Sequence, residues 1–408
     1  MSGTAKRNIF VCYLSDAILG TYFQLPIWIV YQSKFLSFEQ IAFYSGLALL
    51  TEVIMQMPTG AFADMYGRKL SLALGNLFMA LPMFLIALYP NTSIMLLYSF
   101  MWGLGNAFCM GTNKPIVYET LQKEGRTDLF AKILGKSVVT FQISAAISIL
   151  IGGYLYQVSP QLPYYVSGIG SLIGVFTAFL FIEPKIQKTK FNIKKFMEKN
   201  KEGFLEIFKT SYLTKLTILF VLMGGIASVN QKFFVQPYMV ELGMGDIERS
   251  WVSMLIKIFI AVLGAKIISY KRISNKKAFI LTLPILMVLT LLPASIVTLP
   301  LAYITFTGIA FTSGNSGLFI SPEIQDHLNS SVRSTALSAQ KMLLSFVGVL
   351  IQWISAPIIA GSSVGNFYVY LGIFTLVCIL PLAWNIMLSK KKMESLVLDI
   401  GTTESSKL

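Results

Sequence analysis

Residues 60–69 read Gly60-Ala61-Phe62-Ala63-Asp64-Met65-Tyr66-Gly67-Arg68-Lys69, and this stretch decides how the sequence is interpreted. It joins the second of about twelve long apolar segments to the third. Its two glycines permit a tight turn and a close approach of two backbones. A carboxylate such as Asp64 is stabilised by about 0.3–1 kcal/mol at the N-terminus of another helix. We therefore expect a charged connection that fixes how membrane helices meet.

The composition is that of a membrane protein. Of 408 residues, 55% are hydrophobic and 13% are charged, which no soluble domain of this size shows. Apolar segments of about 20–26 residues cross about 30 Å of hydrocarbon when they are helical, whereas open strands would leave backbone groups unpaired in lipid. The predicted spans, one to twelve, are 8–31, 40–63, 71–89, 93–118, 134–157, 162–182, 212–236, 249–270, 278–297, 300–322, 337–359 and 364–388.

Positive charge gathers on one side of these spans. The chain carries 33 Lys and Arg against 19 Asp and Glu, a net charge of +14. Only Lys34 and Arg249 fall in loops of the opposite side, which is the positive-inside bias rather than a nucleic-acid-binding patch. We therefore expect both termini in the cytoplasm and no nucleic-acid partner. The first apolar segment is too long for a signal peptide and is expected to be a retained span.

The spans are expected to form two halves. We predict an N-terminal six-helix bundle at 1–182 and a C-terminal six-helix bundle at 212–388. Between them, the basic segment 183–211 is expected to be a cytoplasmic linker with an amphipathic helix on the inner membrane face. This linker is interpreted as a simple tether, although a regulatory role stays open. Residues 389–408 are expected to form a cytoplasmic tail.

The two halves repeat each other weakly, at an offset near 207–211 residues. The stretch Tyr22–Pro26 of span one is similar to Phe233–Pro237 of span seven. Duplicated halves are how many secondary transporters build a binding site at the bilayer midplane. No metal or cofactor is expected, because the three cysteines have no metal-ligand spacing and the single histidine lies in a loop.

Charged residues inside the spans are the strongest functional signal after residues 60–69. A charge at the bilayer centre costs at least about 2.5–3.5 kcal/mol, so it usually faces a cavity or a partner. Asp16 and Glu52 are candidate proton carriers, because burial favours the protonated form of a carboxyl group. A static ion pair, for example Glu52 with Lys257, and substrate contact alone are the alternatives. Lys114 is placed where its side chain can reach the inner membrane surface.

Residues 60–69 and the twelve spans together resemble the major facilitator superfamily over nearly the whole chain. The stretch Glu52–Gly60 resembles a bacterial drug-efflux-like subgroup. The resemblance implies an all-α integral membrane fold of twelve helices in two pseudo-symmetric six-helix bundles. It also implies a monomer in the inner or cell membrane, with spans one, four, seven and ten around the substrate cavity.

The resemblance further implies functional residues. A cytoplasmic charge network is expected to lock the two halves in the outward-facing state. Its expected members are Asp64, Arg68, Glu119 and Arg126, with Asp326 and Arg333 as second-half partners. Gly60, Gly67 and Lys69 are expected to complete this conformational gate. Candidates for the substrate cavity are the polar, aromatic and basic residues Tyr22, Gln24, Trp28, Asn106, Asn113, Lys114, Asn230, Gln231, Lys232, Gln236, Lys257 and Asn315.

Some positions depart from the subgroup. Gln56 stands where a second acid is more frequent, span four lacks the arginine of many drug–proton antiporters, and Ser148-Ile149 replaces the Gly-Pro step of span five. Proton-driven export of a small amphiphilic or drug-like molecule is nevertheless the leading expectation. The alternative is uptake or exchange of an anionic metabolite, which the span lysines Lys114, Lys232 and Lys257 suggest. A membrane enzyme is not expected, since no nucleophile motif is present, and a transport-inactive sensor would keep the same fold.

Overall fold

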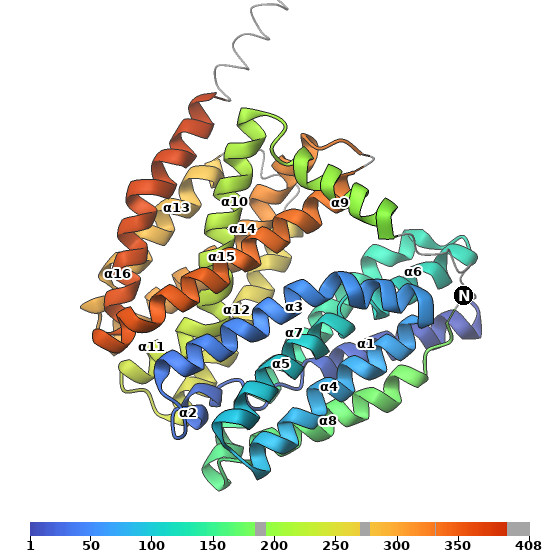
Figure 1. Cartoon of the computed structure of the whole chain (residues 1–408), viewed down its shortest axis with the longest axis horizontal. Coiled ribbons are helices and arrows are strands. Elements are labelled where there is room, and N and C mark those ends of the chain that lie inside the picture. Colours follow the sequence, from blue (N-terminus) through green and yellow to red (C-terminus); the bar gives the residue numbers. More distant parts are fainter. Residues whose placement is uncertain (184–192, 270–277, 331, 390–408) are drawn as a thin grey trace, which may run out of the picture. The chain divides into compact units, whose positions relative to one another are not determined.

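The computed structural model describes residues 1–183, 193–269, 278–330 and 332–389, and in these ranges the chain consists of helices and their connections (Figure 1). The predicted tail beyond Ser389 and the first part of the linker lie outside the described residues. The helices before the linker are α1 (Gly3–Leu19), α2 (Trp28–Gln32), α3 (Phe38–Tyr66), α4 (Arg68–Leu88), α5 (Thr92–Cys109), α6 (Asn113–Lys123), α7 (Phe130–Val158) and α8 (Leu162–Phe179).

The later helices begin with α9 in the linker. They are α9 (Ile193–Glu206), α10 (Ser211–Val229), the π-helix η2 (Asn230–Phe234), α11 (Val235–Glu241), α12 (Asp246–Ser269), α13 (Ala278–Leu291), α14 (Leu299–Asp326), α15 (Arg333–Gly361), α16 (Val364–Phe374) and the π-helix η4 (Thr375–Ile379). Short 3-10 turns lie at Thr127–Leu129 and Leu292–Ser295.

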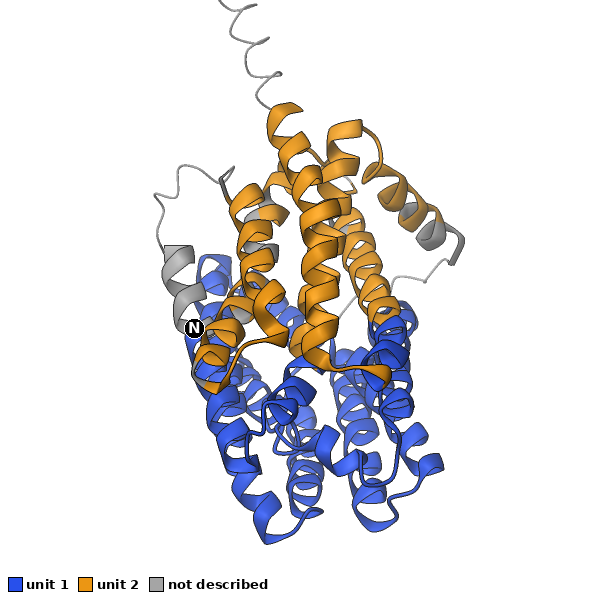
Figure 2. Cartoon of the chain, turned by 90° about the vertical axis from the view of Figure 1, so that its left-hand side faces the viewer, with its two compact units in different colours: residues 1–192, 233–265, 352–360 blue, residues 193–232, 266–351, 361–408 orange. Residues whose placement is uncertain are grey.

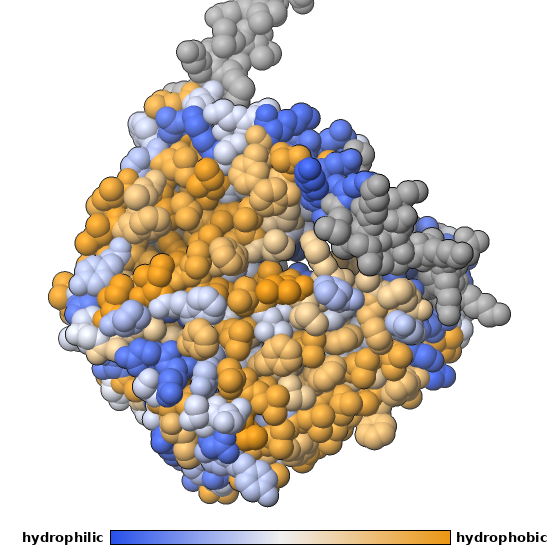
Figure 3. Space-filling view, viewed as in Figure 1, coloured by the Kyte–Doolittle hydropathy of each residue, from blue (hydrophilic) through white to orange (hydrophobic). Residues whose placement is uncertain are grey.

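The all-helical membrane fold is confirmed. Eight helices among the described residues are long and apolar enough to cross a membrane, and they correspond to spans two to seven, eleven and twelve. The four other predicted spans overlap α1 and α2, α12, α13 and α14. Hydrophobic side chains cover much of the surface over α4, α5 and α16, as lipid contact requires (Figure 3).

The chain divides into two compact units (Figure 2). Unit 1 contains Met1–Asn192, Phe233–Ala265 and Gln352–Ala360. Unit 2 contains Ile193–Lys232, Lys266–Ile351 and Gly361–Leu408. Inside unit 1, α4 packs against α8 and α5, and α3 packs against α5; inside unit 2, α14 packs against α10 and α13. The domain boundaries expected from the sequence stay a prediction.

Span one is interrupted near its middle. α1 ends at Leu19, and residues 20–27 form turns before α2 begins. Pro26 cannot donate a backbone hydrogen bond, which disfavours a continuous helix. Backbone exposed in this way must be covered by protein at membrane depth. Gly152 of α7 allows that cover, because a Cβ atom at this position would overlap the backbone carbonyl of Phe23.

Span seven carries an irregularity at the matching position. The π-helix Asn230–Phe234 precedes Pro237, and π-helical turns are frequent at functional sites. The similar stretches Tyr22–Pro26 and Phe233–Pro237 thus lie at a helix break in one half and beside a π-helix in the other. The weak sequence repeat therefore coincides with a repeated departure from regular helix.

Replacing Gly152 tests the close approach beside the break. Gly152→Ala should destabilise the protein by about 1–3 kcal/mol, because the added methyl group is forced into the Phe23 carbonyl. Gly135→Ala on the same helix is the control, since a Cβ atom at Gly135 meets nothing within 4 Å. Thermal unfolding of the purified proteins in detergent measures both. Equal unfolding temperatures for the two variants would contradict the packing described here.

Candidate functional site: a buried carboxylate and a charged connection

Asp16 is a buried carboxylate with four hydrogen-bond donors around it. It lies on α1 and is 3% exposed. Its Oδ1 accepts hydrogen bonds from Nδ2 of Asn113 at 2.9 Å and from Nζ of Lys114 at 2.8 Å. Its Oδ2 accepts from the hydroxyl of Ser137 and, at 3.7 Å, from the thiol of Cys12. Groups on α1, α6 and α7 therefore converge on one carboxyl group.

The pair of Asp16 with Lys114 places opposite charges inside unit 1. The Asp16 side chain is 4% exposed and the Lys114 side chain 32% exposed. A carboxylate removed from water needs both a positive partner and further hydrogen bonds, and Asp16 has both. Lys114 therefore neutralises Asp16 in this structure, whereas the sequence placed it where it could reach the membrane surface.

The other charged candidates of unit 1 occupy intermediate environments. Glu52 is half-buried on α3, and Lys257 is half-buried on α12. Their role as a static pair, or of Glu52 as a proton carrier, stays a prediction. In unit 2, Gln231 and Lys232 are exposed within the π-helix of span seven.

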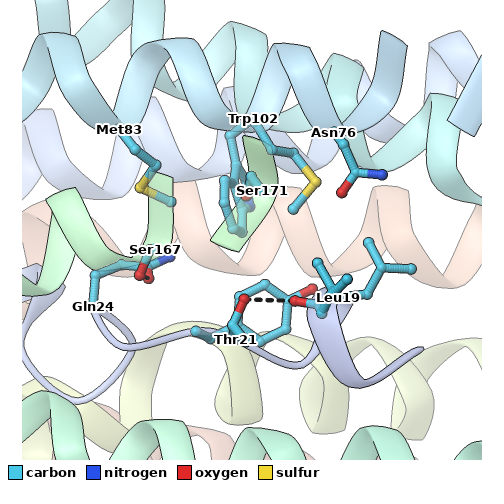
Figure 4. A pocket seen from close by; sticks show the side chains of 11 residues that line it. Leu19, Thr21, Gln24, Asn76, Met83, Trp102, Ser167 and Ser171 are labelled. Carbon is cyan, nitrogen blue, oxygen red and sulfur yellow. Dashed lines mark hydrogen bonds between the residues drawn. The ribbon is translucent and has the colours of Figure 1, made fainter. Parts of the chain in front are cut away.

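A small pocket lies beside the break in span one (Figure 4). Its volume of about 10 Å³ is enough for one water molecule. Gln24 lies beside Ser167, whose hydroxyl donates to the Gln24 Oε1 at 2.6 Å. The Tyr22 ring packs edge-on against Trp102, with centroids 5.8 Å apart. The cavity candidates Tyr22 and Gln24 therefore lie inside the bundle formed by α1, α4, α5 and α8, where Asn76 completes the polar lining.

The remaining cavity candidates of unit 1 make hydrogen bonds or ring contacts with neighbouring residues. Asn106 is half-buried, and its Nδ2 donates to the Trp102 carbonyl one turn earlier at 2.9 Å. The Trp28 ring is half-buried, with its centroid 6.0 Å from that of Phe233. Gln236 is buried and donates to Ser253 at 3.4 Å.

Asn230 is a buried cavity candidate of unit 2. It is 2% exposed, and its Oδ1 accepts a hydrogen bond from the Tyr368 hydroxyl. Its Nδ2 has no partner among the described residues. Asn230 and Thr312 both line a cavity of about 10 Å³. The side chain of Asn315 lies outside the described part of the chain.

The charged connection at residues 60–69 contains one strong ion pair. Arg68 Nη1 lies 2.6 Å from Glu119 Oε1, with side-chain exposures of 14% and 27%. Arg126 instead contacts Asp128 at 3.7 Å, and both side chains are exposed. Asp64 is exposed and makes no ion pair within the described ranges. The structure thus brings Arg68 and Glu119 together but adds neither Asp64 nor Arg126 to them.

Glu183 is a residue of this connection that the sequence analysis missed. Its Oε1 accepts the backbone N–H groups of Arg68 and, at 3.2 Å, of Lys69, so it caps the N-terminus of α4. Gly67 has a φ of 109°, and a Cβ atom there would lie 2.8 Å from Glu183 Oε2. At Gly60, by contrast, a Cβ atom would meet nothing within 4 Å. The close approach expected of both glycines is therefore found at Gly67 alone.

The expected second-half partners of the charge network, Asp326 and Arg333, have a different arrangement. Asp326 is exposed, and Arg333 donates to the Leu328 carbonyl at 3.4 Å, so the two are not paired with each other. Glu323, just beyond predicted span ten, is buried and accepts a hydrogen bond from the Tyr212 hydroxyl at 3.2 Å. The sequence could have indicated Glu323, because this acid lies within one turn of the expected end of span ten.

Membrane-crossing helices, with a charged connection between spans two and three, define a multi-pass membrane protein. The chain belongs to the Major Facilitator Superfamily, whose family model matches residues 8–352.

The chain spans about half the length of the relatives that it matches. An uncharacterised transporter of this superfamily from Bacillus subtilis, YxaM, is 25% identical over 243 residues, 56% of this chain and 58% of its own. Multidrug resistance protein 1 of the same organism is 24% identical over 234 residues, with the same two coverages. Quinolone resistance protein NorA of Staphylococcus aureus is 24% identical over 188 residues, 45% of this chain and 47% of its own.

Solved structures share the fold over nearly the whole chain. A mutant form of the nucleoside transporter NupG has a TM-score of 0.78 at 13% identity, covering 95% of this chain and 99% of its own. A D-xylose–proton symporter has a TM-score of 0.70 at 11% identity, covering 93% and 99%. At these identities the likeness concerns the fold alone.

Removing the partner of Asp16 tests the buried ion pair. Lys114→Met should destabilise the protein by about 1–3 kcal/mol, less than for a fully buried pair because a third of the lysine side chain is exposed. The double variant Asp16→Asn/Lys114→Met should recover most of that loss, because no uncompensated charge remains. Thermal unfolding in detergent measures the cycle. Additive losses in the double variant would show that the two side chains do not stabilise each other.

Proposed function

We propose that this transporter exports a small amphiphilic or drug-like molecule in exchange for protons, by alternating access. The observation that carries the proposal is the Asp16 carboxylate, which lies in predicted span one and is buried between α1, α6 and α7. Such a group is expensive to keep charged in a low-dielectric interior unless a partner is present. A titratable group with this surrounding is typical of proton relays in transporters.

Proton binding would change the contacts of Asp16 in a defined way. A carboxylate only accepts hydrogen bonds, whereas a protonated carboxyl group also donates one and has no charge to attract Lys114. A proton at Asp16 would therefore weaken the pair that joins α1 to α6. Since α1 and α6 belong to spans one and four, this change would act on the helices proposed to line the substrate cavity.

The relatives favour export over the alternative. Two of them are named as a multidrug resistance protein and a quinolone resistance protein. Uptake or exchange of an anionic metabolite remains the second candidate, supported by Lys232 and Lys257. Lys114, the third lysine that suggested an anionic substrate, is paired with Asp16 and therefore supports this candidate less.

Proton flux in liposomes tests the proposal. Purified protein is reconstituted with a pH-sensitive dye inside, a pH gradient is imposed, and cationic dyes, neutral drugs and organic anions are added in turn. We expect a cationic or neutral amphiphile to cause proton movement in the wild type. Asp16→Asn and Glu52→Gln should reduce this movement to the level of empty liposomes, whereas the exposed Asp128→Asn should leave it unchanged.

Two results would contradict the proposal. Exchange of labelled compounds without any proton movement would exclude proton coupling and leave both carboxylates with structural or substrate-binding roles. A response to organic anions alone would replace drug export by the second candidate.

A further inference from the structure

Two adjacent side chains of α15 form hydrogen bonds with α3, a helix from the first half of the sequence, and both partners lie in unit 1. Gln352 is 0% exposed, and its Nε2 donates to the carbonyl of Ala42 at 3.1 Å and to the hydroxyl of Ser45. Trp353 Nε1 donates to the carbonyl of Phe43 at 3.3 Å. These bonds join residues that are more than 300 positions apart, so they connect the first half of the sequence to the second.

Aromatic packing and one glycine complete this contact. The Trp353 ring stacks on Phe43, with centroids 5.4 Å apart and an interplanar angle of 25°. The indole also lies against Gly46, where a Cβ atom would come within 2.8 Å of Cδ1 and closer still to Nε1. Any larger residue at position 46 would therefore push the indole away from α3.

The contact lies toward the side that the charge distribution predicts to be extracellular. α3 begins at Phe38, shortly after the loop that carries Lys34, and α15 ends at Gly361, before a very short predicted outer connection. Other contacts in unit 1 also join the two halves of the sequence near helix ends that are predicted to be extracellular. Phe233 packs against Phe38 with centroids 5.5 Å apart, and Gly153 of α7 lies directly against Ser250 of α12.

We propose that Gly46, Gln352 and Trp353, with the α3 groups that they contact, form an extracellular latch that closes the outer side of the transporter and must release in every cycle. The closed latch also contains one unfavourable feature, which favours its release. The Oε1 atom of Gln352 is buried without a hydrogen-bond partner among the described residues, and opening would return it to water. The closed latch is therefore held by several bonds and weakened by one unpaired acceptor.

The latch is independent of what the protein carries. It acts on whether the outer side is open, so it holds for a drug, a metabolite or any coupling ion. Its test therefore needs neither substrate nor proton gradient, and its failure leaves the proposed export activity untouched.

Spin labels at Ser33→Cys and Ala360→Cys, two exposed positions of unit 1 near the outer ends, report opening by the distance between them. The exposed Cys378 is replaced by serine in every variant, and Cys12 and Cys109 are buried. We expect a short distance in the parent protein. Gly46→Ala should add a longer-distance population, because its methyl group displaces the indole, and Trp353→Ala should do the same by removing the stack and the N–H bond.

The double variant Gly46→Ala/Trp353→Ala decides between a latch and general damage. The three atoms nearest to a Cβ atom at position 46 all belong to the indole, so without Trp353 the methyl group loses its closest contacts and the double variant should match Trp353→Ala alone. Trp384→Ala removes an exposed tryptophan of the last span and should leave the distances unchanged. If Gly46→Ala fails to fold, Ser45→Ala takes its place in the experiment. This variant removes only one hydroxyl acceptor, so it should add a smaller long-distance population. Unchanged distances in both single variants, or additive effects in the double variant, would overturn the latch.

Discussion

Hydrocarbon offers no hydrogen bonds, so every polar group at membrane depth must find its partner inside the protein. Asp16 shows how this constraint is met, because Lys114, Asn113, Ser137 and Cys12 all turn toward one carboxyl group. The same requirement governs the interrupted span one, whose backbone is covered by neighbouring helices. Charge and irregular backbone thus occur together in unit 1, where other helices cover both.

Glycines make this shielding possible. Gly152 lets α7 approach the unwound backbone near Phe23, and Gly46 lets the Trp353 indole approach α3. In both places a single methyl group would fill the space that a carbonyl or a ring now occupies. The close contacts therefore depend on the absence of a side chain, which is also why small substitutions at these positions give sharp tests.

The proposed proton site and the proposed latch act at different depths of unit 1. Asp16 joins α1 to α6, whereas Gln352 joins α3 to α15 near the ends predicted to be extracellular. A change at one is expected to bias the other only through the helices between them. Both share one physical feature, a buried polar side chain whose bonds can be exchanged for others during transport.

The sequence by itself determined the class of protein, because length and hydrophobicity of segments are local properties and a membrane leaves only helices as solutions. It also indicated Asp16, Arg68 and Glu119 as important charges. Only the tertiary structure decided which charges meet: Lys114 with Asp16, and Glu183 with the N-terminus of α4. Such partners lie about a hundred residues apart, and no local pattern encodes the helix packing that brings them together.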